Sequence, residues 1–262
     1  MKNFIISLVD AADRRTHIRN EFNKSEILFT FFDAINITQI DEVSAQLNLN
    51  LSNSDLTNGE KACLLSHVYL WNKAIQDHLE YIAIFEDDIL LGEHISSFLN
   101  NNHWISEEID IIKLEAFSPS ALMSLKKIPI TKQRYLRKMQ GIHLGAAGYI
   151  LSQKSAKTLL KYIQNLDVII PVDHILFEFF IEHSDLNIYQ ICPALCIQSD
   201  RLNSNPNTSV IHSQLESERR ERLDYNLLNE RKIKKNLVFK INREYQRLVI
   251  KLKLLFCKIS FK

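Results

Sequence analysis

Short apolar runs and amphipathic stretches alternate along most of the chain. Runs rich in β-branched and aromatic residues predict buried strands at residues 4–9, 29–32, 81–85, 109–114, 142–151 and 187–192. Stretches with apolar residues at helical spacing predict helices at residues 12–24, 57–79, 153–163 and 171–181. Helices that alternate with apolar strands favour an α/β fold with a doubly wound, mostly parallel sheet.

The helix before the 81–85 strand has the clearest start signal. Thr57 precedes Glu60 by three residues, which is the spacing of a capping box. Residues 36–58 lack such a pattern and are expected to form a loop with a weak helix. Residues 115–140 are equally irregular, and we expect a mobile loop over the functional site.

Two glycines, Gly145 and Gly148, lie inside the 142–151 run. Glycine inside a strand marks a place where the backbone approaches another group closely. Residues 198–230, by contrast, are polar and are expected to form a linker with a helical end.

Composition is that of an ordinary globular protein. Of 262 residues, 46% are hydrophobic and 24% are charged, which suits one large α/β domain or two small ones. The 4 cysteines show no framework spacing, which indicates reduced thiols. No apolar run reaches the length of about 18 residues that a membrane-spanning helix needs.

The net charge of +1 conceals an uneven distribution. Residues 231–262 contain 11 Lys and Arg and one acid, whereas residues 1–230 contain 21 basic and 30 acidic residues. We therefore divide the chain into a body, residues 1–230, and a basic tail, residues 231–262. Apolar residues recur at helical spacing in the tail, which predicts a basic amphipathic helix that binds an anionic membrane surface. The alternative is a helix packed on the body or on a partner chain, and no motif supports nucleic-acid binding.

Three consecutive acids, Glu86, Asp87 and Asp88, directly follow the 81–85 strand. Ligands of open α/β sheets bind at the carboxyl ends of the strands, where these acids are expected. Carboxylate oxygens suit Mg²⁺ or Mn²⁺, which would neutralise a diphosphate leaving group. The alternative is an acidic turn that lies wholly in water. The motifs of serine esterases, zinc proteases, P-loop kinases and dinucleotide oxidoreductases do not occur in the sequence.

Around these acids the sequence resembles glycosyltransferase family 25, the bacterial lipooligosaccharide galactosyltransferases. The resemblance runs over roughly residues 3–212. The combination of segments is specific for the family, whereas any one segment alone is not. The matching segments follow in the same order: Ile5-Ile6-Ser7-Leu8, Arg14-Arg15, Gly59-Glu60-Lys61-Ala62-Cys63, Leu65-Ser66-His67, Phe85-Glu86-Asp87-Asp88, Gly148-Tyr149 and Pro171-Val172-Asp173-His174.

This resemblance implies a GT-A type fold, which is a Rossmann-like sheet with flanking helices. It implies transfer of a hexose, galactose first, from a UDP-sugar donor with inversion, onto a lipid-linked oligosaccharide. The implied location is cytoplasmic, peripheral on the inner face of the bacterial inner membrane. The rival hypothesis is a non-catalytic nucleotide- or glycan-binding protein of the membrane surface that kept the fold.

The resemblance also implies roles for individual residues. The acidic motif of the family has the form Asp-x-Asp, and here Glu86 takes the first place, with Asp88 as the foremost metal ligand. Asp87 is expected to face the ribose or sugar of the donor. Four residues near the first strand are expected to contact the donor nucleotide or diphosphate: Ser7, Leu8, Arg14 and Arg15. For the two arginines, a solvated helix face is an equal alternative.

Inverting transfer needs a base that takes the proton of the acceptor hydroxyl. Asp173 is the first candidate, because a helix N-terminus would keep it ionised; the alternative is that it merely caps this helix. Glu115, after the 109–114 strand, is the rival base. His212 lies where GT-A enzymes often supply a metal-binding histidine, although a histidine in a polar segment is often simply exposed.

Overall fold

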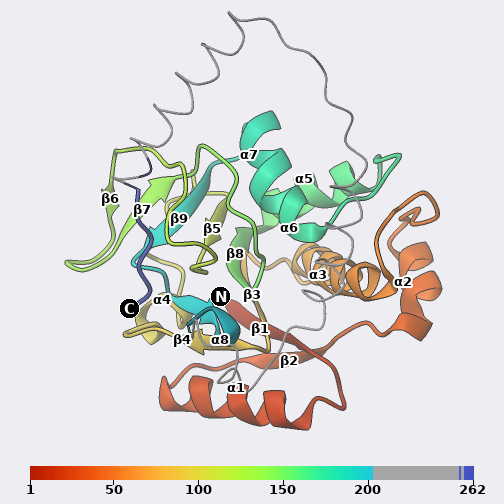
Figure 1. The fold of residues 1–262 in the computed structure, drawn as a ribbon, viewed down its shortest axis with the longest axis horizontal. Coiled ribbons are helices and arrows are strands. Elements are labelled where there is room, and N and C mark those ends of the chain that lie inside the picture. Colours follow the sequence, from red (N-terminus) through yellow and green to blue (C-terminus); the bar gives the residue numbers. More distant parts are fainter. Residues whose placement is uncertain (203–253, 255–256) are drawn as a thin grey trace, which may run out of the picture.

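In the computed structural model, residues 1–202, 254 and 257–262 are described. An eight-stranded sheet runs through the centre in the order β2-β1-β3-β8-β5-β9-β7-β6 (Figure 1). Its strands are β1 (Lys2–Ser7), β2 (Thr30–Asp33), β3 (Tyr81–Glu86), β5 (Ile111–Lys113), β6 (Ile128–Pro129), β7 (Tyr135–Lys138), β8 (Gly148–Ser152) and β9 (Ile188–Cys192).

Most strands of this sheet point the same way. Strand β1 runs parallel to both β2 and β3, and β5 runs parallel to β9. Only β8 and β7 are reversed, because β8 pairs antiparallel with β3 and β5, and β7 pairs antiparallel with β9 and β6. The expected α/β class with a mostly parallel sheet is confirmed.

Helical segments cover the sheet and connect its strands. They are α1 (Ala12–Lys24), η1 (Ile37–Gln39), α2 (Ile40–Gln46), α3 (Asn58–Gln76), α4 (Ser96–Leu99), α5 (Gln153–Ile163), α6 (Val172–His174), η2 (Ile175–Phe179), α7 (Phe180–His183) and α8 (Ser199–Leu202). The capping box predicted at Thr57 and Glu60 begins α3. The single helix expected over residues 171–181 is wrong, because η2 is a π-helical turn with a non-helical residue, Phe177, between α6 and α7.

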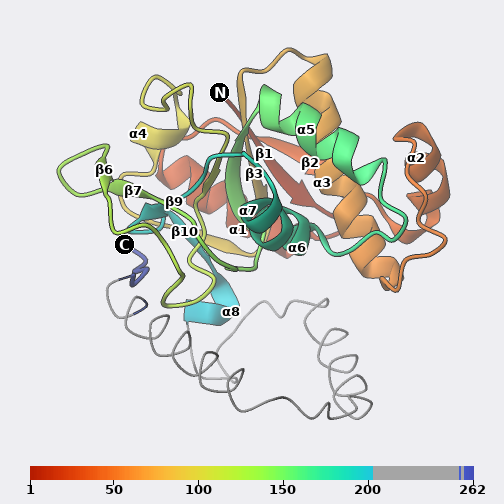
Figure 2. The same cartoon turned by 90° about the horizontal axis from the view of Figure 1, so that it is seen from above.

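Two apolar cores lie on opposite faces of the sheet, and the alternation of side chains along the strands separates them. On β1, Phe4 and Ile6 face the core that contains Trp71 of α3, whereas Ile5 faces the core that contains Phe22 of α1. Helices α3 and α5 lie side by side on the first face, and α1 covers the second (Figure 2). Trp71 and Phe22 are both fully buried.

Two parts of the chain contain strands that the sequence pattern did not predict. The loop expected over residues 115–140 includes β6 and β7, which pair as a hairpin at the sheet edge. A second, two-stranded sheet joins β4 (Ile89–Leu91) to β10 (Cys196–Gln198), and the sequence pattern did not predict it. Because β4 directly follows the three acids, this small sheet fixes the turn that carries them.

The chain end packs on the body. Cys257 and Ile259 are buried in a third apolar cluster beside Met123 and Ala194. The Arg134 guanidinium donates to the carbonyl oxygen of Lys262 at 2.6 Å. The amphipathic helix expected in the tail falls almost wholly outside the described residues. Among the described helices, none is both long and apolar enough to cross a membrane.

Candidate active site

The three predicted acids lie at the carboxyl end of β3, as the sequence indicated. Glu86 is the last residue of β3, and Asp87 and Asp88 form the turn that leads into β4. Asp87 is 6% exposed and Asp88 is 5% exposed. The alternative of an acidic turn wholly in water is therefore wrong.

Asp87 is fixed by residues of β1 and α1. Ser7 Oγ donates to Asp87 Oδ2 at 2.6 Å, and Arg14 Nη1 donates to Asp87 Oδ1 at 3.0 Å. These contacts follow from the topology, because β1 and β3 are parallel neighbours whose carboxyl ends adjoin, with Ile6 opposite Glu86. Three of the predicted site residues thus converge.

Arg15 lies on the outer side of the same strand end. Its guanidinium donates to the carbonyl oxygens of Ser7 and Leu8, forms an ion pair with Asp33 and covers the ring of Phe31. Arg15 thereby joins the ends of β1 and β2, so the alternative of a merely solvated side chain is wrong for it. Leu8 is 42% exposed beside this contact.

The carboxyl of Asp88 has a strongly raised pKa. Burial, and after it the charges of Glu86 and Asp87, raise the pKa of its carboxyl from 3.8 to about 8, with Arg14 opposing the shift. Gln198 Nε2 lies 3.3 Å from Asp88 Oδ2 and 3.4 Å from Glu86 Oε2. A buried carboxylate among other carboxylates is a ready ligand for a hard cation.

Gln198 is a site residue that the sequence reasoning missed, because we expected residues 198–230 to be a linker. It is the last residue of β10, and the pairing of β10 with β4 brings it opposite Ile89. Arg201 then follows on α8; its Nε lies 3.3 Å from Gln198 Oε1, and its guanidinium covers the ring of Phe117. No local motif marks either residue, since a long-range strand pairing places them.

Helix α3 places a further group, His67, beside Glu86. His67 is fully buried, and its Nε2 lies 3.6 Å from Glu86 Oε1. Its Nδ1 is 2.9 Å from the hydroxyl of Tyr149, which also accepts from Trp71 Nε1 at 2.9 Å. Burial lowers the pKa of His67 to about 4, so its imidazole is neutral near pH 7.

Glu115 lies in a buried ionic group at the end of β5. Its Oε2 accepts from the backbone N–H of Ala147 at 3.1 Å and lies 3.5 Å from Lys113 Nζ. The Lys113 ammonium also donates to the carbonyl oxygens of Leu144 and Gly145. Burial raises the pKa of Glu115 and lowers that of Lys113, although each charge opposes the shift of the other.

Asp173 approaches the same group from the other side. It is 2% exposed in the first turn of α6, and its Oδ2 accepts from the backbone N–H of Gly145 at 3.3 Å. The N-cap of α6 is Pro171, without a side-chain cap bond, so the capping alternative for Asp173 is wrong. Gly145 has φ 88°, and an added Cβ would lie 2.7 Å from Glu115 Oε2. The close approach predicted for this glycine is confirmed.

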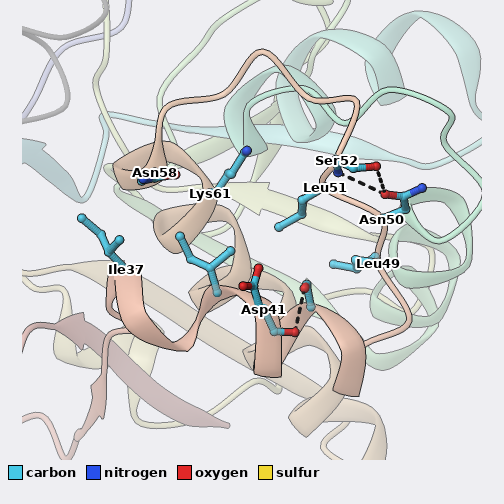
Figure 3. A pocket seen from close by; sticks show the side chains of 10 residues that line it. Ile37, Asp41, Leu49, Asn50, Leu51, Ser52, Asn58 and Lys61 are labelled. Carbon is cyan, nitrogen blue, oxygen red and sulfur yellow. Dashed lines mark hydrogen bonds between the residues drawn. The ribbon is translucent and has the colours of Figure 1, made fainter.

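A hollow of about 440 Å³ lies near the start of α3, away from the predicted site residues (Figure 3). Amide, hydroxyl and carboxylate groups share its wall with aliphatic side chains, a combination that suits the polar edge and apolar face of a sugar ring. The groups include Asp41, Asn50, Ser52, Asn58 and Lys61, with Leu49 and Leu51. His212 lies outside the described residues.

The site has carboxylates at the ligand edge of a sheet that is covered on both faces. This arrangement suits an enzyme that handles phosphate-bound groups. Comparison with known proteins identifies the class as a glycosyltransferase. The sequence profile of the family described as "Glycosyltransferase family 25 (LPS biosynthesis protein)" matches residues 1–176. The chain belongs to this family, as the sequence motifs indicated.

Several curated relatives match over most of their length. Lipooligosaccharide biosynthesis protein lex-1 of Haemophilus influenzae is 35% identical, covering 93% of this chain and 92% of that protein. Lacto-N-neotetraose biosynthesis glycosyltransferase LgtE of Neisseria gonorrhoeae is 35% identical, with 84% and 82% covered. LgtB of Neisseria meningitidis serogroup B is 34% identical, with 86% and 87% covered. Among solved structures, a glycosyltransferase involved in the glycosylation of the major capsid of PBCV-1 aligns with a TM-score of 0.43 at 7% identity, covering 85% of this chain and 100% of that one.

Proposed function

We propose that this glycosyltransferase transfers a hexose, galactose first, from a UDP-sugar onto the oligosaccharide of a lipooligosaccharide, with inversion at the anomeric carbon. The names of the relatives support the acceptor class, since they refer to lipooligosaccharide and lacto-N-neotetraose biosynthesis. The observation that carries the proposal is the buried carboxylate of Asp88, surrounded by acids at the ligand edge of the sheet.

The residues at this edge fit Mn²⁺ or Mg²⁺. Asp88 and Glu86 offer hard oxygen ligands. The raised pKa of Asp88 reflects burial first and then the negative charge of Glu86 and Asp87, which a divalent cation would balance. When bound, the ion supplies charge neutralisation of the UDP diphosphate as it leaves. His212 remains the proposed third ligand.

The protein's own residues bind the donor and move one proton. Ser7, Leu8, Arg14 and Arg15 line the nucleotide side, with Asp87 held toward the ribose or sugar. Asp173 takes the proton of the acceptor hydroxyl, whose oxygen forms the new bond to the anomeric carbon. The bond to the UDP oxygen breaks on the opposite face, which inverts the configuration. Glu115 remains the rival base.

The hollow near the start of α3 is the place that we propose for acceptor sugars. Helix α3 carries Lys61 at the hollow and His67 against Glu86, so one helix connects the hollow to the acids. Replacing Lys61 by alanine should raise the KM for the acceptor several-fold. UDP release without acceptor should stay unchanged, and an equal loss in both assays would contradict this placement.

The basic tail is proposed to dock the enzyme on the anionic cytoplasmic face of the inner membrane, where a lipid-linked acceptor would be presented. Each Lys or Arg near such a surface contributes about 1 kcal/mol.

The test of the proposed function is a screen of UDP-sugars for manganese-dependent UDP release. We expect UDP-galactose to be hydrolysed or transferred, and Asp88→Ala to stop the reaction. The anomeric configuration of the product, read by NMR, tests inversion. Donor binding without turnover on any oligosaccharide acceptor would favour the non-catalytic hypothesis.

A further inference from the structure

A sulfur, an imidazole and a carboxylate meet between α3 and the end of β3. The ligand atoms of Cys63, His67 and Glu86 all lie within 4.8 Å of one another. We propose that these three residues bind one transition-metal ion of the zinc class, at a site distinct from the hard-cation site at Asp88. None of the roles assigned above uses Cys63 or His67.

The spacing of the ligands suits this ion. Cys63 and His67 are four residues apart on α3, so both side chains project from one face of the helix. Two nitrogen or oxygen ligands of a tetrahedral zinc ion lie about 3.3 Å apart, given zinc–ligand distances of about 2 Å. The observed separation of His67 Nε2 and Glu86 Oε1 is 3.6 Å. A thiolate and an imidazole favour zinc over magnesium or manganese.

The imidazole of His67 is prepared as a ligand. Its Nε2 is buried without a hydrogen-bond partner among the described residues, and it points at Glu86. The other ring nitrogen is held by the Tyr149 hydroxyl, which is itself held by Trp71. In the metal-bound state Nδ1–H donates to Tyr149 Oη and Nε2 carries the lone pair for the ion. A partner of this kind on the second nitrogen is typical of metal-binding histidines.

Glu86 connects the two sites. Its Oε1 faces His67, whereas its Oε2 lies 3.4 Å from Gln198 Nε2, which also contacts Asp88. An ion on Oε1 would tie α3 to the end of β3 and fix the orientation of the first acid of the triplet. The proposal does not rest on sugar transfer, because binding is measured without donor or acceptor.

Cobalt is the direct probe, because a thiolate ligand gives Co²⁺ a charge-transfer band in the near ultraviolet. The full chain, stripped with a chelator, should bind one Co²⁺ with this band, and Zn²⁺ should displace it. Cys63→Ser keeps the side-chain shape and should remove the band while lowering the affinity for Zn²⁺ about 10-fold or more. Cys192→Ser, at a buried thiol elsewhere, is the matched control and should keep both.

The wild-type chain allows a second test without any variant. Cys63 is half-buried, whereas Cys192, Cys196 and Cys257 are buried, so iodoacetamide should alkylate Cys63 first in the folded protein. Zn²⁺ should slow this alkylation about 10-fold or more and Mg²⁺ should not, as peptide mass spectrometry would measure.

Two outcomes would overturn the proposal. One is a cobalt spectrum without the thiolate band, or with a band that Cys63→Ser leaves intact. The other is an alkylation rate that Zn²⁺ does not change, which would leave His67 as a hydrogen-bonding support for Glu86 through Nε2–H. Asp88→Asn separates the two sites, because it should stop UDP release and keep the cobalt band.

Discussion

Burial and the charges of neighbouring acids both disfavour ionisation of Asp88. Its carboxyl titrates near 3.8 when unperturbed, and its pKa rises to about 8 in the folded, metal-free chain. Between these values the folded state holds a proton that the unfolded state has lost, so the free energy of unfolding falls as the pH rises. If Asp88 binds the proposed cation, the ion would offset this loss of stability.

Asp88→Asn should remove this pH dependence. At pH 8 without metal, the variant should melt above the wild type, by about 2–4 °C for each kcal/mol of the penalty that the substitution removes. Near pH 5 the difference should shrink, because the wild-type carboxyl is then protonated. Calorimetry at the two pH values measures this. If the melting temperatures of variant and wild type differ by the same amount at both pH values, the raised pKa of Asp88 is contradicted.

Asp173 and Glu115 can be separated by the kinetics of their amide variants. If Asp173 is the base, Asp173→Asn should lower kcat by about 10²–10⁴ and leave the donor KM nearly unchanged. Glu115→Gln preserves the size of a side chain that accepts from Ala147, and it should lower kcat far less. The opposite order of the two losses would assign the base to Glu115. Both variants need a normal melting temperature for the comparison to hold.

At the scale of elements, local sequence patterns predicted individual strands and helices but not the pairing of strands. The apolar run before Glu86 predicted the strand that the acids follow. The capping box at Thr57 predicted the residue at which α3 begins. The reversed direction of β8 could not be read from its apolar residues, because pairing partners determine it. Gln198 escaped for the same reason, since only the pairing of β10 with β4 brings it to Asp88.

Gly145, in the loop before β8, shows how one backbone position contacts two site residues. Its backbone N–H donates to Asp173, while its Cα faces Glu115 so closely that a Cβ would lie 2.7 Å from Oε2. Gly145→Ala should therefore lower the free energy of unfolding by about 1–2 kcal/mol from its positive φ alone, and more from the contact. Denaturant titration measures the loss.

Gly141→Ala is the matched control. The three atoms nearest to its added Cβ all belong to the Leu122 side chain, the first at 3.0 Å, and its φ lies outside the left-handed region. It should cost clearly less stability and leave kcat unchanged, whereas Gly145→Ala should lower kcat as well. Equal effects of the two substitutions would mean that the approach to Glu115 is not a constraint.

At the scale of the whole molecule, the uneven charge separates an acidic body from a basic tail. The structure adds that the last residues, 257–262, pack into the third apolar cluster of the body, with Arg134 holding their final carbonyl. A truncation that removes the tail would therefore also open this cluster. Membrane docking has to be tested by changing charge and leaving the chain end in place.

Replacing Lys240, Arg243, Arg247 and Lys251 by glutamine meets this requirement. At about 1 kcal/mol for each residue near an anionic surface, affinity for phosphatidylglycerol-containing vesicles should fall by about 10³-fold. Transfer to a water-soluble oligosaccharide should be unchanged, because none of these four residues is assigned a role in the proposed site. Flotation with vesicles measures the first quantity, and binding of the wild type should weaken with added salt. Neutral vesicles are the control and should bind neither form. Unchanged flotation of the variant with anionic vesicles would favour the alternative that the tail packs on protein.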